Sequence, residues 1–103
     1  MQTASLYAQL NREFFRDRLP VYRVRFRQFD RPGQEGECKP TARTILLATP
    51  LKGDPQKLRQ VLLHEMCHIG SPGHGLRFQA KLARLAANGE SWAEELRREL
   101  ADR

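Results

Sequence analysis

The sequence predicts an α+β domain in which a small β-sheet packs on helices. Apolar residues recur at helical spacing near the N-terminus, alternate with polar residues around positions 21–27, and return to helical spacing from about position 54. At 103 residues the chain is long enough for one modest hydrophobic core. We therefore expect residues 1–103 to form a single domain.

A first helix is predicted up to about Asp17, with Thr3 or Ser5 as its N-terminal cap. Leu19-Pro20 then ends it, because proline cannot continue a helix. Its apolar stripe consists of residues at helical spacing, namely Leu6, Leu10 and Phe14.

The next segment predicts a half-buried strand with one apolar and one basic face. The arginine face is a candidate contact for nucleic-acid phosphates. The alternative is a charged strand edge that only discourages aggregation. Apolar residues and arginines alternate along this segment in the order Tyr22, Arg23, Val24, Arg25, Phe26 and Arg27.

Residues 30–40 are rich in glycine, proline and charge and predict a loop or hairpin, with a short strand near Cys38. A second strand is predicted from Arg43 to Ala48. Asp54-Pro55 then supplies an N-cap followed by proline at the first helical position. We expect the helix that begins there to be largely buried, with its histidine face open to a cleft. Its apolar cover comes from Leu58, Val61, Leu62, Met66 and Ile69.

Two further helices are predicted after this one. The first starts at about Gly75 and ends at Asn88-Gly89, and Ser91 and Glu94 have the spacing of a capping box for the second. Their apolar positions are Leu76, Phe78, Leu82, Leu85 and Ala86 in the first and Trp92, Leu96 and Leu100 in the second.

The chain has three histidines, which fall close together at positions 64, 68 and 74. Four residues of helix advance by about 400°, so His64 and His68 stand about 40° apart on one face, roughly 6 Å along the axis. One metal ion can therefore reach both. Glu65 lies beside the first of them and can accept a proton from a water molecule at the metal, as in a zinc-dependent peptidase.

His74 is the candidate third ligand, because a catalytic zinc usually keeps three protein ligands and leaves a fourth position to water. The segment between His68 and His74 contains a proline and two glycines and must turn rather than continue the helix. Such a turn can bring His74 back toward the first two histidines. We therefore expect one catalytic Zn²⁺ held by His64, His68 and His74.

The two cysteines are expected to be free thiols. Cys67 lies about 100° round the helix from His68 and is expected to face the core. Cys38 is either an ordinary loop or strand residue or a thiol that occupies the open zinc position in a latent form.

Composition is ordinary for a soluble globular protein, with 40% hydrophobic and 29% charged residues and no apolar run of membrane-spanning length. Polar residues at positions 11–13 interrupt the place of a signal-peptide core, so a cytoplasmic location is expected by default. The net charge of +6 indicates either affinity for nucleic-acid phosphates or another acidic partner, or only a feature of solubility.

Four stretches of the chain carry a family resemblance. They are Asn11-Arg12-Glu13-Phe14-Phe15 with Leu19-Pro20 and Val24-Arg25-Phe26, then Thr44-Ile45-Leu46-Leu47, then Val61 to His68, and finally Gly73-His74-Gly75-Leu76-Arg77-Phe78. These stretches resemble the SprT-like zinc metallopeptidases, the family that contains the proteases of DNA–protein crosslinks.

The resemblance implies a zincin-like fold with an active-site His-Glu-x-x-His helix. It implies His64, His68 and His74 as zinc ligands and Glu65 as general base. The segment between the second and third histidines is short, and the C-terminal four-cysteine zinc ribbon of many members has no counterpart, so the match covers the catalytic core. Any recruitment to DNA is then expected from the arginine face of residues 23–27.

The leading hypothesis is a zinc-dependent endopeptidase, with DNA-associated proteins as candidate substrates. The substrate is expected to pair in extended form with a sheet edge at Arg43–Ala48. Tyr7, Tyr22 and Arg77 are candidate oxyanion donors. The alternatives are a metal-dependent RNA hydrolase and a nucleic-acid-binding module that zinc stabilises without catalysis.

Overall fold

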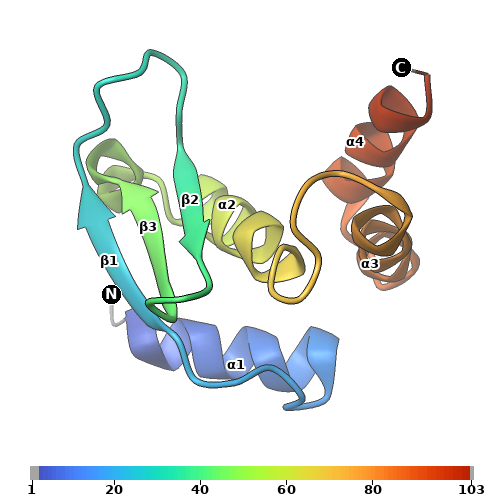
Figure 1. Ribbon diagram of the computed structural model, residues 1–103, viewed down its shortest axis with the longest axis horizontal. Coiled ribbons are helices and arrows are strands. Elements are labelled where there is room, and N and C mark those ends of the chain that lie inside the picture. Colours follow the sequence, from blue (N-terminus) through green and yellow to red (C-terminus); the bar gives the residue numbers. More distant parts are fainter. Residues whose placement is uncertain (1–2, 103) are drawn as a thin grey trace.

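The computed structural model describes residues 3–102 and confirms the expected α+β architecture. Figure 1 shows the central helix α2 between the sheet and the paired helices α3 and α4, with α1 across one end of the sheet. The elements in chain order are α1 (Thr3–Phe15), β1 (Arg23–Arg27), β2 (Gly36–Lys39), β3 (Thr44–Ala48), a short 3-10 helix η1 (Thr49–Gly53), α2 (Pro55–Cys67), α3 (Leu76–Ala87) and α4 (Ser91–Ala101).

The sheet has the strand order β1-β3-β2, so β3 is its central strand. β1 runs parallel to β3, and β2 runs antiparallel to it with Gly36 opposite Leu47. The expectation that residues 43–48 offer a free edge to a substrate is therefore wrong. β3 carries consecutive apolar residues, with Ile45 and Leu47 fully buried, as a strand with neighbours on both sides requires.

The hydrophobic core forms around α2. The helix buries Leu58, Val61, Leu62 and Met66, as its apolar pattern predicts, and Leu63 and Cys67 in addition. In β1 the alternation is confirmed, because the arginines at 23, 25 and 27 are exposed and the residues between them are half-buried. None of the helices within residues 3–102 is long and apolar enough to cross a membrane.

Hydrogen bonds from side chains of α1 hold the turn that follows this helix. Arg16 and Asp17 adopt positive φ angles of 54° and 59° and end the helix. The buried side chain of Asn11 donates to the Leu19 carbonyl at 3.0 Å and accepts from the Leu19 N–H at 3.2 Å. One turn earlier, the Tyr7 hydroxyl donates to the Pro20 carbonyl at 2.6 Å. These bonds fix the position from which β1 starts.

The N-cap of α2 forms as predicted, because the Asp54 carboxylate accepts the Lys57 N–H at 3.1 Å and proline follows at the first helical position. α3 ends at the predicted place, followed by Gly89 with a φ of 97°.

The capping predictions for the first and last helices are wrong. Thr3 and Ser5 both lie within α1, and the Thr3 hydroxyl donates to the Val24 carbonyl at 3.3 Å instead. Glu90, not Ser91, precedes α4, and its side chain does not cap the helix. Glu94 accepts charge-assisted bonds from the guanidinium group of Arg97, which are stronger than a bond to a backbone N–H.

Candidate metal centre

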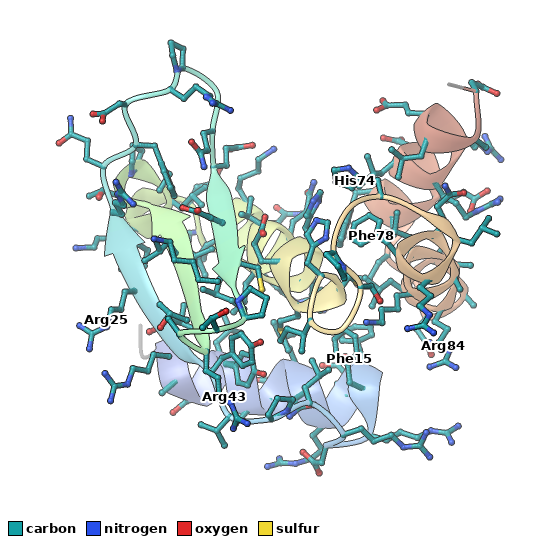
Figure 2. The ribbon with its side chains drawn as sticks, in the orientation of Figure 1. Phe15, Arg25, Arg43, His74, Phe78 and Arg84 are labelled. Carbon is teal, nitrogen blue, oxygen red and sulfur yellow. The ribbon has the colours of Figure 1, made fainter. Side chains whose placement is uncertain are left out.

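The side chains of all three histidines converge. One ring nitrogen from each histidine lies within 4.8 Å of those of the other two. His64 lies in the last turns of α2 and His68 follows at its end, while His74 projects from the loop before α3 (Figure 2). Zinc–nitrogen bonds of about 2.0–2.1 Å place two ligating nitrogens at most about 4.2 Å apart. The three imidazoles therefore converge to within a small inward movement of sharing one zinc ion, and no fourth protein ligand joins them among residues 3–102.

The loop between the second and third histidines turns as its sequence predicts. Gly70 and Gly73 both have a φ of 77°, a region that side chains with a Cβ rarely adopt. Between them Ser71 is buried, and its N–H donates to the His68 carbonyl at 3.0 Å. The two glycines thus allow the reversal that carries His74 back to the end of α2.

Phe78 forms a floor beneath the three imidazoles, a role that the sequence analysis missed. Its ring is buried and stacks on His68 with a centroid distance of 4.3 Å and an interplanar angle of 16°. The centroids of His64 and His74 lie 5.4 Å and 5.0 Å from it. Helical spacing assigned Phe78 only to the core. Its position four residues after His74, in the first turn of α3, was the available signal.

Burial favours the neutral form of the two imidazoles on α2 and at its end. Burial first, and then the neighbouring His68 and His74, lower the pKa of His64 to about 4. The pKa of His68 is also lowered, mainly by burial. Nδ1 of His68 lies 3.3 Å from the Ser71 carbonyl oxygen. When Nδ1 carries the proton it donates to that oxygen, which leaves the Nε2 lone pair free for a metal.

Glu65 is a buried carboxylate beside these imidazoles, with 8% of its surface exposed. No hydrogen bond or ion pair to its side-chain carboxylate is found among residues 3–102. Burial first, and then the nearby Glu37, raise its pKa to about 7. A base of this kind is suited to exchanging protons near neutral pH.

Strand β2 passes very close to Glu65. A Cβ atom on Gly36 would lie 3.0 Å from Cγ and Oε2 of Glu65 and 3.0 Å from Cγ1 of Val61. Any side chain at this position would have to displace one of these two neighbours. Glycine at position 36 therefore lets the strand backbone run directly over the carboxylate.

Glu65 lies between two hollows, which confirms the predicted cleft. The larger hollow, of about 560 Å³, also contains His64 and extends toward α4. The smaller one, of about 190 Å³, contains His68 and Cys38. Cys38 thus faces the site, but its sulfur is not part of the converging donor group found among residues 3–102. Cys67 is fully buried in the core, as expected.

The three candidate oxyanion donors lie outside both hollows. Tyr7 and Tyr22 are buried and stacked on each other, and the Tyr7 hydroxyl is committed to Pro20. Arg77 is exposed on α3 and lines a separate depression. The exposed arginines of β1 are likewise absent from both hollows.

A lysine of α3 fastens the end of α2. Nζ of Lys81 donates to the carbonyl oxygens of Cys67 at 3.2 Å and Ile69 at 2.6 Å. A cation is favourable there, since the last carbonyls of a helix carry partial negative charge. Lys81 and Phe78 thus lie on one helix and together hold α3 against the histidine-bearing end of α2.

Comparison with known proteins agrees with this geometry. The model of the SprT-like family matches residues 3–97. The chain belongs to the SprT-like family. No curated protein matches it. Among solved structures, the crystal structure of the metallopeptidase zymogen of Methanocaldococcus jannaschii jannalysin is similar, with a TM-score of 0.66, 15% identity, and coverage of 99% of this chain and 96% of that one. A likeness at this identity shows that this SprT-like chain shares the fold.

Glu65→Gln is expected to stabilise the metal-free SprT-like protein at high pH. A folded-state pKa of about 7 against an ordinary 4.5 means that the folded state binds this proton more tightly than the unfolded chain. Wild-type stability therefore falls as pH rises from about 4.5 through 7, whereas glutamine has no charge to bury. One pKa unit corresponds to about 1.4 kcal/mol, so the variant gains about 3 kcal/mol at pH 8 and nothing at pH 4.

Urea unfolding with a chelator present, measured between pH 4 and pH 8, tests this difference. The lowered pKa of His64 makes stability rise with pH, which is the opposite direction. This contribution is the same in the wild type and in Glu65→Gln, so it cancels when their stabilities are compared. Glu13→Gln, at an exposed position of α1, is the control and is expected to match the wild type throughout. Equal stability of Glu65→Gln and the wild type at pH 8 would show that burial does not disfavour the ionised form of the Glu65 carboxylate.

Proposed function

We propose that this chain is a zinc-dependent endopeptidase formed by residues 1–103 as one domain, with His64, His68 and His74 as metal ligands and Glu65 as general base. The observation that carries the proposal is a largely buried glutamate beside three converging imidazoles, whose carboxylate has no hydrogen-bond or ion-pair partner among residues 3–102. Membership of the SprT-like family and a fold shared with a metallopeptidase zymogen support it. A structural zinc site would normally be closed by a fourth protein ligand.

The zinc ion and the residues around it have separate roles in the proposed reaction. When bound, zinc supplies a Lewis acid that polarises a peptide carbonyl and acidifies a water molecule. The Glu65 carboxylate would accept a proton from the attacking water molecule and pass it to the leaving amine nitrogen. Burial and the nearby Glu37 together raise the pKa of Glu65 to about 7, so the carboxylate can both accept and release a proton near neutral pH. Phe78 excludes water from beneath the imidazoles.

We infer that the substrate pairs with β2. This strand is bonded to β3 on one side, and no strand among residues 3–102 pairs with its other side. Figure 1 shows it as the strand nearest α3 and α4. Gly36 lines the larger hollow and Cys38 the smaller one, so an extended chain added to this edge would pass Glu65. Backbone pairing of this kind tolerates varied side chains in a substrate.

We further propose that the exposed arginines at positions 23, 25 and 27 bind nucleic acid and bring DNA-associated proteins to the site. Their strand is the opposite edge of the sheet from β2. Figure 2 shows Arg25 pointing away from the molecule on the side opposite His74. Nucleic acid bound there would leave the β2 edge open to a polypeptide.

Glu65→Gln is expected to lower proteolysis by about 10²–10⁴-fold, the usual contribution of a general acid–base group. The three imidazoles are unchanged, so the variant should retain one zinc ion per chain. Cleavage of a casein-like protein, measured alongside metal content, tests both statements. His74→Ala is the companion variant and should lose zinc together with activity.

Other outcomes, with RNA tested as a substrate alongside the protein, would contradict this mechanism or favour the alternative functions. Full proteolysis by the Glu65→Gln protein would rule out the proposed mechanism. Cleavage of RNA but not of protein by the wild type would point to a metal-dependent RNA hydrolase. A zinc-stabilised binding module predicts that the variant keeps both its zinc and its function.

Gly36→Ala is expected to reduce kcat for peptide cleavage by at least about tenfold, because the added methyl group must displace the Glu65 carboxylate or Val61. Zinc content should stay the same. Gly53→Ala is the matched control, since a Cβ there meets no atom within 4 Å and its φ is not positive. Equal kcat values for the two variants would show that the contact between β2 and Glu65 does not position the base.

Replacing the three arginines of β1 by glutamine is expected to weaken binding to single-stranded DNA. The slope of log K against log salt concentration should fall by about 2 if all three contact phosphates. Cleavage of a short peptide without DNA should not change. The control replaces three exposed arginines near the end of α1, at positions 12, 16 and 18. An equal loss of affinity in both triple variants would show that binding is not localised to β1.

A further inference from the structure

We propose that the larger hollow beside Glu65 is a subsite for a lysine or arginine side chain of the polypeptide substrate. This inference rests on the proposed peptidase function and names the substrate residue that the site prefers. The hollow measures about 560 Å³, large enough for a long side chain and part of the neighbouring backbone.

The hollow adjoins the reacting groups directly. His64 and Glu65 line one wall, residues 33–36 before and at the start of β2 line the second, and α4 lines the third. Glu65 is more than nine-tenths buried, has no hydrogen-bond partner among residues 3–102, and lines this space. A side chain entering here therefore belongs to a residue close to the bond that is cut.

One face of α4 forms the wall opposite the histidines. Trp92, Glu95, Leu96 and Glu99 all line the hollow, at the spacing that places them on one side of a helix. The indole Nε1 of Trp92 donates to Glu90 at 3.1 Å, which fixes the orientation of the ring. This wall thus combines apolar surface with two carboxylates.

The charge of the hollow is opposite to that of the protein. The chain has a net charge of +6, yet the lining residues include Glu35, Glu65, Glu95 and Glu99 against the single cation Lys57. Lys57 lies 3.6 Å from Glu35 and compensates that charge. Glu95 and Glu99 have no ion-pair partner among residues 3–102. The arginines of α4, at positions 97 and 98, bind Glu94 outside the hollow.

Lysine and arginine side chains fit this lining in both chemistry and length. Their methylene stems can lie along Val61, Trp92 and Leu96, while the charged end meets Glu95 or Glu99. The face of an indole adds attraction for a cation. A metal ion fits less well, because the only group of converging ligand atoms within residues 3–102 is that of the histidines. An acidic side chain would be repelled.

Trp92 is the only tryptophan of the chain, so its fluorescence reports directly on occupancy of the hollow. We would titrate zinc-loaded Glu65→Gln protein with peptides that differ at one position, which holds lysine, norleucine or glutamate in turn. Norleucine retains the apolar stem without the charge. The lysine peptide is expected to bind at least about tenfold more tightly than the glutamate peptide and about threefold more tightly than the norleucine peptide.

Glu95→Gln combined with Glu99→Gln should remove the preference for lysine over norleucine and leave binding of the norleucine peptide unchanged. Glu94→Gln is the control, because it removes one carboxylate charge from the same helix but outside the hollow. It should keep the full preference. In the active protein, kcat/KM for the three peptides should follow the same order.

The possible results separate this inference from the proposed function. Cleavage of all three peptides at equal kcat/KM, with no effect of the Glu95 and Glu99 substitutions, would overturn the subsite and leave the peptidase standing. Lysine-selective quenching of Trp92 without cleavage of any peptide by the wild type would overturn the peptidase and leave a binding site for basic side chains. Equal loss of preference in Glu94→Gln would overturn the assignment to this face of α4.

Discussion

The packing of α2 between the sheet and α3 determines both the hydrophobic core and the positions of the metal-binding histidines. The helix buries Leu58, Leu62 and Met66 among neighbours on several sides, so it cannot rotate without exposing apolar surface. Each fully buried leucine contributes about 1.5–3 kcal/mol in transfer free energy, and a rotation that exposed these side chains would lose that contribution. The side that carries His64 and His68 is thereby held toward the cleft, and Glu65 is held beneath β2.

The third imidazole depends on a second contact, between α3 and the end of α2. The loop that bears His74 contains two glycines at positive φ and has little stiffness of its own. Phe78 and Lys81 hold this loop in position. The first packs beneath the rings and the second binds the carbonyls at the end of α2, so the loop is fixed at both ends. Burial around these contacts also keeps His64 and His68 neutral and therefore able to bind a metal.

Features that depend on residues close together in the chain could be predicted from the sequence. Features that depend on packing between separate elements could not. The N-cap at Asp54, the alternation in β1 and the turn before His74 each depend on residues near one another in the chain. The order of the strands does not, which is why β3 was mistaken for an edge although its consecutive apolar residues indicate a covered strand. The floor under the histidines and the face of α4 beside Glu65 likewise arise only when separate helices pack against one another.

The distribution of charge follows from the same arrangement. β1 and β2 are the two edges of one sheet, separated by β3, which places them about 10 Å apart at the usual strand spacing. Salt screens exposed charges over about 8 Å at physiological ionic strength. Each edge therefore presents mainly its own charge, arginines along β1 and glutamates around the hollow beside β2. A polyanion held at the first edge and a basic polypeptide at the second would not compete, and a protein bound to DNA offers both at once.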